Sequence, residues 1–88
     1  MKSRTTPDRP RGHAKLKRGI PGRIARIRGK RSQRAFAREL GVFQQNVNRY
    51  EKGTTPHVDF LLVLALRENV SLDWLVAGRG RPHRNATA

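Results

Sequence analysis

Residues 32–53, SQRAFARELGVFQQNVNRYEKG, decide the fold because they hold two short helical patterns separated by a tight turn. Ser32 is a good N-cap for the first helix, and the apolar stripe behind it ends at a glycine. After the turn, Val47 and Tyr50 fall on one face of a second pattern that another glycine closes. This pattern predicts two helices in close contact, the second running from about Gln44 to Lys52.

Helical patterns also flank this stretch on both sides. Residues 21–28 begin with a proline, which suits a first helical turn, and end before a glycine. Residues 58–67 are so apolar that much of that helix must be buried, and Ser71 offers an N-cap for a last helix ending near Gly78. No strand pattern is convincing. The sequence therefore predicts an all-α fold, a compact five-helix bundle spanning residues 20–78.

The two ends of the chain contain few apolar residues. Residues 1–19 are rich in Lys, Arg, Pro and Gly with a single Leu, which predicts a flexible basic arm, either solubilising or attracted to phosphates. Residues 79–88 predict a loose basic tail. Within it, Arg79-Gly80-Arg81-Pro82 matches the core of an AT-hook, so Arg79 and Arg81 are candidate minor-groove contacts. Such a short match also arises by chance in so basic a chain.

The charge balance indicates a polyanionic partner. Lys and Arg number 20 against 6 Asp and Glu, a net charge of +14 that is far more than solubility requires. There is no Cys, and no apolar stretch has the length of a signal peptide core or a membrane span. The three His residues are too scattered for a metal site, and no catalytic arrangement is visible. We expect a cytoplasmic protein that is not an enzyme and needs no cofactor or metal.

Residues 32–53 strongly resemble the Cro and repressor type (XRE-like) of helix-turn-helix found in phage and bacterial regulators. The resemblance is carried by Ser32-Gln33, Ala37, Gly41 and Glu51-Lys52-Gly53, and it continues through Pro56 and Ser71–Leu75. It implies the phage-repressor DNA-binding domain fold, with the helix-turn-helix at helices 2 and 3 of the five. Two departures are Phe43, where the family usually has a Ser or Thr cap, and the short link at residues 29–31.

Polar residues on the exposed face of the 44–52 helix suit the edges of DNA bases. A Gln or Asn can pair with adenine and an Arg with guanine, each worth roughly 1–3 kcal/mol of discrimination. The residue types and the resemblance together give four expected base readers: Gln44, Gln45, Asn48 and Arg49. Contacts to phosphates, which set the register, are expected from Gln33, Asn46, Lys52, Thr54 and Thr55.

The expected function is that of a sequence-specific transcriptional regulator, a repressor of bacterial or phage origin associated with the nucleoid. Family and geometry imply that it binds a palindromic operator in double-stranded DNA as a homodimer, with reading helices about 34 Å apart. Three alternatives stay open. The same fold could serve an antitoxin or a bridging coactivator, and the charge could serve a structured-RNA or ribosome-associated protein. The polar face could also be an ordinary solvated surface of a small bundle.

Overall fold

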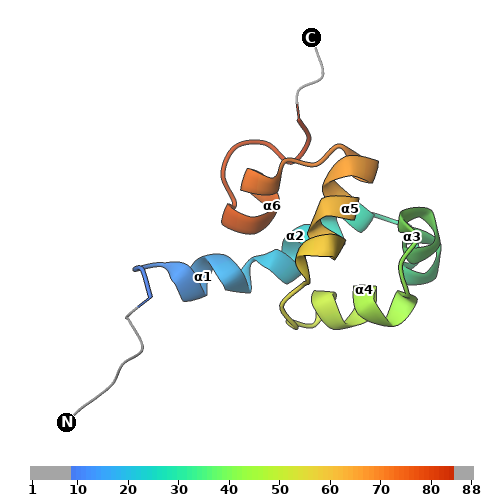
Figure 1. Cartoon of the computed structure of the whole chain (residues 1–88), viewed down its shortest axis with the longest axis horizontal. Coiled ribbons are helices and arrows are strands. Elements are labelled where there is room, and N and C mark those ends of the chain that lie inside the picture. The colour runs from blue at the N-terminus through green and yellow to red at the C-terminus, as the bar shows by residue number, and fades with distance from the viewer. Residues whose placement is uncertain (1–8, 85–88) are drawn as a thin grey trace.

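Six α-helices follow one another along the chain in the computed structural model (Figure 1), which describes residues 9–84. Their bounds are α1 His13–Arg18, α2 Ile20–Arg28, α3 Gln33–Leu40, α4 Gln44–Glu51, α5 Val58–Glu68 and α6 Leu72–Ala77. Within the described part of the chain the only β-type pairing is one isolated bridge, between Val70 and His83. The fold is therefore all-α, as predicted.

The five predicted helices correspond to α2–α6, with ends within one or two residues of those expected. The predicted caps are confirmed, because the Oγ of Ser32 accepts a hydrogen bond from the amide of Ala35 and the Oγ of Ser71 accepts one from Trp74. Gly41 ends α3 at φ 77°, a left-handed conformation that favours glycine and starts the tight turn. At the start of α4, Phe43 provides no side-chain cap and is 74% exposed.

α1 was not predicted, and it corrects the expectation that the whole of residues 1–19 lacks regular structure. It continues almost directly into α2, with Gly19 in the right-handed helical region between them. Pro21 explains the break, because a proline cannot donate the backbone hydrogen bond that an uninterrupted helix would need there. Figure 1 shows α1 extending to one side of the other helices. Residues 1–8 lie outside the described part.

The core forms where α2, α3 and α4 meet α5 and α6. Tyr50 and Phe60 pack edge to face with ring centroids 4.7 Å apart, which joins α4 to α5. Ala37, small as expected at a helix contact, is buried between α3 and its neighbours. The buried cluster consists of Ile20, Ile24, Ile27, Phe36, Ala37, Leu40, Val47, Tyr50, Phe60, Leu64, Val70, Trp74 and Leu75.

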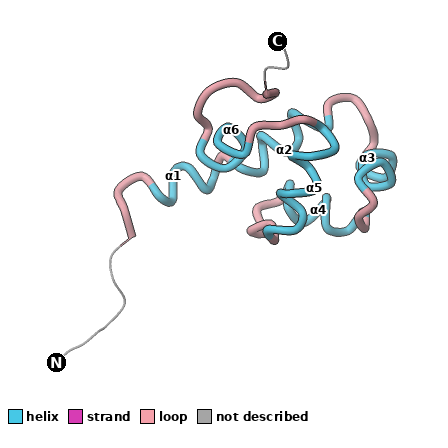
Figure 2. The backbone as a smooth tube through the Cα atoms, turned by 45° about the horizontal axis from the view of Figure 1, so that its top comes forward, coloured by secondary structure: helices cyan, strands magenta, loops and turns pink. Residues whose placement is uncertain are grey.

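Residues 79–84 return to the body of the molecule, which corrects the expected loose tail for this part of it. Figure 2 shows the segment as a loop that leaves α6 and arcs back over the helices. The amide of Ser71 donates to the carbonyl of Pro82 at 2.8 Å, and the amide of Arg84 donates to the carbonyl of Asn69 at 3.0 Å. Residues 85–88 lie outside the described part.

Candidate nucleic-acid interface

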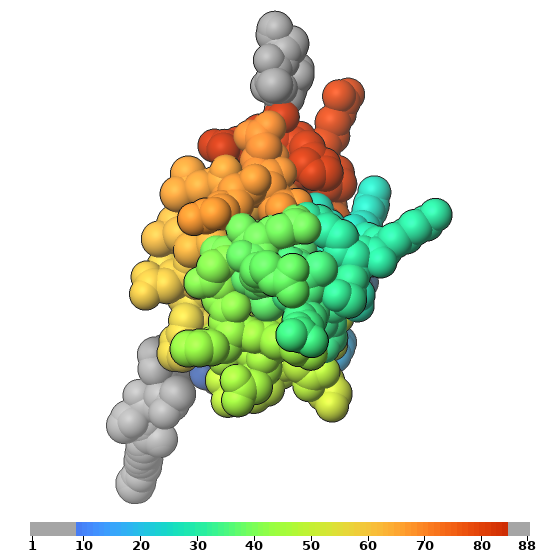
Figure 3. Space-filling model, turned by 90° about the vertical axis from the view of Figure 1, so that its right-hand side faces the viewer, coloured from blue at the N-terminus to red at the C-terminus, as the bar shows by residue number. Residues whose placement is uncertain are grey.

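One face of α4 presents four polar side chains together. Gln44, Gln45, Asn48 and Arg49 line a shallow, open hollow of about 660 Å³. Three of them are exposed, and Asn48 is partly buried. In the space-filling view of Figure 3, α3 (green) and α4 (yellow-green) occupy the centre of the face turned to the viewer, with α4 below α3. All four predicted base readers therefore lie on one surface.

The opposite face of α4 is fixed to the core. Val47 is fully buried and Tyr50 is 2% exposed, and both belong to the apolar cluster shared with α2, α3 and α5. A helix of eight residues is too short to be stable alone in water, so this packing is what holds it. The four polar side chains consequently project from a rigid support.

The four side chains differ in how they are held. Arg49 donates from Nη2 to Oδ1 of Asn46 at 2.8 Å, one turn away on the same helix. Asn48 donates from Nδ2 to Oε1 of Gln33 at 3.1 Å, which links α4 to the first turn of α3. For Gln44 and Gln45, the described residues supply no side-chain hydrogen bond, so both amides remain available for a ligand.

A small network beneath this surface connects α2, α3 and α4. Glu51 accepts two hydrogen bonds from the guanidinium of Arg28, at 2.8 and 2.9 Å, and one from Nε2 of Gln33 at 3.1 Å. Burial raises the pKa of Glu51, but the bonds from Arg28 and Gln33, with the charge of Arg28, outweigh it and leave the pKa lowered. Gln33 thus bridges Glu51 and Asn48, so it orients a candidate base reader as well as lying at the start of α3.

The other predicted phosphate contacts lie at the two ends of α4 or in the loop after it. Asn46 is partly buried, and Lys52, Thr54 and Thr55 are exposed. The loop is positioned by backbone hydrogen bonds, including one from the amide of Thr54 to the carbonyl of Arg49 at 3.0 Å. Asn46 is joined to the four side chains of α4 through Arg49, whereas Lys52 and Thr55 line separate hollows at the C-terminal end of α4 and in the loop after it.

The candidate minor-groove residues Arg79 and Arg81 are exposed, but their backbone is tied down on both sides. The amide of Arg79 donates to the carbonyl of Asp73 at 3.3 Å, and Pro82 accepts the hydrogen bond from Ser71 described above. An AT-hook contacts DNA as an extended segment lying in the groove. To bind in that way, residues 79–82 would have to leave the position that they occupy in this structure.

Three arginines in or just after α2 have structural roles. The guanidinium of Arg23 donates to the carbonyls of Leu75, Leu16 and Val76 at 2.7, 2.9 and 3.1 Å, so it joins the ends of α1 and α6 to α2. Arg28 pairs with Glu51. Arg31 donates to Glu39 and Glu68 and to two carbonyls at the end of α2. Bidentate and cap contacts of this kind leave no sequence pattern that could have revealed them.

Comparison with known proteins supports the helix-turn-helix assignment of α3 and α4. A family model of helix-turn-helix domains matches residues 23–75, which include α3 and α4 and most of the core. The chain belongs to this DNA-binding helix-turn-helix family, of the Cro and repressor type. No curated protein and no solved structure matches the chain.

None of the helices in residues 9–84 is long and apolar enough to cross a membrane. Those residues also contain no cluster of three or more His, Cys, Asp or Glu that could bind a metal ion.

Proposed function

We propose that this protein is a sequence-specific regulator of transcription, acting as a repressor, that inserts α4 into the major groove of double-stranded DNA. The observation that carries the proposal is the shared surface of Gln44, Gln45, Asn48 and Arg49 on a helix whose other face is buried. Because the support is rigid, side chains of known hydrogen-bonding type are presented at fixed spacing. That is the requirement for direct readout of base edges.

Each side chain has a distinct role in this proposal. The free amides of Gln44 and Gln45 each offer the donor and acceptor pair that matches adenine, and Arg49 offers the fork that matches guanine. Asn46 steers the guanidinium of Arg49, and Gln33 steers the amide of Asn48. The exposed ring of Phe43, beside Gln44 at the start of α4, is suited to an apolar contact with a thymine methyl group.

Contacts with the DNA backbone would set the position of α4 in the groove. Lys52 supplies a cation at the end of α4, and Thr54 and Thr55 supply hydroxyl groups in the loop that follows. At the start of α3, the side chain of Gln33 lies against Asn48, so Gln33 and the first amides of α3 are further candidates for a phosphate contact. These groups favour any duplex alike, so they contribute affinity and register and leave base choice to α4.

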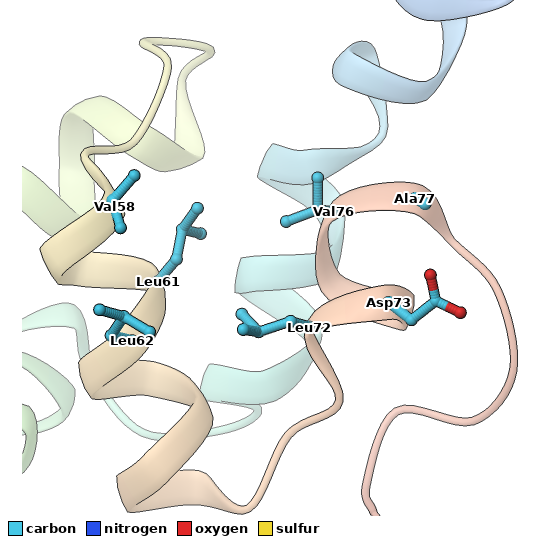
Figure 4. A pocket seen from close by; sticks show the side chains of 7 residues that line it. All are labelled: Val58, Leu61, Leu62, Leu72, Asp73, Val76 and Ala77. Carbon is cyan, nitrogen blue, oxygen red and sulfur yellow. The ribbon is translucent and has the colours of Figure 1, made fainter.

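We also propose that two copies bind a palindromic operator together, since one short reading helix contacts few bases. A groove of about 360 Å³ between α5 and α6 supports this (Figure 4). It is lined by Val58, Leu61, Leu62, Leu72, Asp73, Val76 and Ala77. Figure 4 shows the side chain of Leu72 on α6 extending toward α5, with Leu61 and Leu62 on the facing helix and Val76 above Leu72.

A second copy of this chain is the occupant that fits the groove best. The patch holds both a hollow and exposed apolar side chains, among them Val58 at 67% and Leu62 at 44% exposed, which a self-complementary two-fold contact requires. Its lining contains no Lys or Arg, so two copies of a chain with net charge +14 can meet there without bringing cations together. The groove contains none of the four base readers, which stay free for DNA.

Selection from a random duplex library, repeated in excess structured RNA, tests the proposal. We expect an enriched palindrome whose half-site centres lie about one helical turn apart, and binding to it that survives the RNA competitor. A winner without two-fold symmetry would contradict dimeric binding. If the structured RNA displaced the protein from the selected duplex, the chain would be an RNA-binding protein. If no sequence were enriched, specific readout of bases would be contradicted.

A further inference from the structure

α1 lies beside the end of α4, on the side of the molecule where the phosphate-contacting loop begins. A hollow of about 600 Å³ is lined by Arg9, His13, Lys17 and Arg18 on one side and by Lys52 and Gly53 on the other. A neighbouring hollow of about 420 Å³ joins the same part of α1 to Thr55 and Pro56. Residues 9–18 are therefore brought next to the loop that was expected to hold DNA phosphates.

The first of these hollows is strongly basic. Its lining includes two Arg and two Lys and no Asp or Glu. The ion pairs of the described residues all involve Arg28, at the C-terminal end of α2, or Arg31, just after it, so they do not neutralise the cations of α1. A concave surface with one sign of charge concentrates ions of the opposite sign. Its expected ligand is an anion large enough to span from α1 to Lys52.

α1 is held in this position by a specific contact. Arg23 donates from Nη2 to the carbonyl of Leu16 on α1 at 2.9 Å, and from Nε to the carbonyl of Leu75 on α6 at 2.7 Å. One guanidinium thus fixes the end of α1 against the end of α6. Cations on a helix anchored in this way need less ordering on binding than cations on a random coil, so less of their attraction is offset by lost entropy.

We propose that Arg9 and α1 form a second phosphate-binding edge, which grips the duplex backbone beyond the bases that α4 contacts. The proposal rests on the proposed function for the presence of DNA at α4, and it adds residues outside the matched family segment 23–75. Lys52 is shared by both edges, so the backbone that it contacts passes along the basic hollow. The contact is made by particular side chains, on the face of α1 that carries His13 and Lys17.

α1 offers a matched pair of variants for the test. Lys17 lines both hollows, whereas Lys15 lies on the same helix, is exposed and lines neither. Two residues correspond to about 200° of helical rotation, so the two ammonium groups face different directions. Lys17→Ala and Lys15→Ala remove the same charge from the same helix. Lys17→Gln, which keeps most of the side-chain length, and Lys17→Arg, which keeps the charge, control for folding, with helix content checked by circular dichroism.

The measurement is duplex affinity as a function of salt, on the selected duplex and on a scrambled one. Each phosphate contact contributes a slope of about 0.9, so Lys17→Ala and Lys17→Gln should lower the slope by about that amount on both duplexes. Between 50 and 200 mM salt, their affinity should then fall about 3.5-fold less than that of the wild type. Lys15→Ala and Lys17→Arg should keep the wild-type slope. In a phosphate-ethylation interference experiment, ethylation of one phosphate flanking the bases that α4 contacts should block binding of the wild type. The same modification should no longer interfere with binding of Lys17→Ala and Lys17→Gln, and only with these two variants.

Equal slopes for Lys15→Ala and Lys17→Ala would overturn the proposal, because the charge of α1 would then act without a specific contact. An unchanged slope in Lys17→Ala would overturn it as well. In another outcome, the wild type binds both duplexes equally while the salt slopes of Lys17→Ala and Lys15→Ala still differ. That result would contradict sequence-specific regulation and would support the second phosphate-binding edge. The failure of the two proposals can therefore be told apart.

Discussion

The arginines of the α2 region and the polar residues of α4 all carry N–H donors, but the first set uses them within the molecule and the second set leaves most of them free. Arg23, Arg28 and Arg31 direct their donors into the molecule, to helix carbonyls and to carboxylates of other helices. On α4, Gln44 and Gln45 have no side-chain partner within the described residues, and Arg49 bonds only to its helix neighbour Asn46. The first set stabilises the fold, and the second set remains free to meet a ligand.

This contrast shows that the number of basic residues overstates how many of them are free to contact DNA. The chain has 20 Lys and Arg residues, yet three arginines in or just after α2 instead connect helices that are far apart in sequence. Their role follows from the scarcity of other polar partners in so small a core. Helix ends leave carbonyls without partners, and a guanidinium with five donors can satisfy several of them at once.

The largest expected effect is a loss of stability on substitution of Glu51, the partner of Arg28. Glu51→Ala deletes two hydrogen bonds to Arg28 and one to Gln33, and charged hydrogen bonds of this kind contribute about 1.5–3 kcal/mol each at most. We expect the free energy of unfolding to fall by about 3 kcal/mol, measured by urea denaturation. Glu39→Ala removes an ion pair whose carboxylate is 52% exposed and should change it by less than about 1 kcal/mol. Equal losses would show that the Glu51 network has no special role.

The same carboxylate gives a pH dependence. Because the pKa of Glu51 in the folded chain is lower than its unfolded value, the unfolded chain binds the proton first as the pH falls. The stabilisation is complete above the ordinary pKa of Glu and is lost as the pH falls through the lowered one. The stability difference between wild type and Glu51→Ala should therefore shrink on acidification through this window. A difference that stays constant from pH 7 to pH 2 would contradict the assignment.

Arg23 should have a smaller effect on stability. Arg23→Ala leaves the carbonyls of Leu75, Leu16 and Val76 without their guanidinium donor, and we expect a loss of about 2 kcal/mol. Arg34→Ala, at an exposed position on α3, is the control and should lie within about 0.5 kcal/mol of wild type. Thermal unfolding followed by circular dichroism measures both. If Arg23→Ala matched Arg34→Ala, the clamp between α1 and α6 would be unimportant.

On the α4 side, Lys52→Ala should leave stability almost unchanged and weaken every duplex alike. Loss of one phosphate contact lowers the slope of log affinity against log salt by about one unit. Fluorescence anisotropy on the selected and scrambled duplexes, over a range of salt concentrations, measures this slope. A loss confined to the selected duplex would assign Lys52 to base readout.

Much of the fold could be predicted because local signals mark the helix ends. Ser32, Gly41 and Ser71 predicted three boundaries that the structure confirms. α1 was missed because it buries no side chain of its own and depends on Arg23, whose contact with Leu16 has no local signature. The return of residues 79–84 was missed because it is made by backbone hydrogen bonds and by side-chain bonds between Asn69 and Arg84, contacts that leave no local pattern in the sequence.

The candidate site was predictable in its residue types and less so in its connections. The periodicity of α4 separates Val47 and Tyr50 from the polar residues, so the four side chains could be placed on one face. The bond from Asn48 to Gln33 and the position of Lys52 beside α1 depend on tertiary structure. Sequence patterns specify which side chains share a helix face, and they do not specify which distant residues orient them.

The most direct test of the central claim compares the sequences selected by the wild type, Gln45→Ala and Arg49→Ala. If α4 reads bases, each variant should keep its stability, and its selected sequences should lose preference at one or two positions per half-site. The expected loss is roughly 1–3 kcal/mol of discrimination. Selected sequences that are identical for all three proteins would contradict the account.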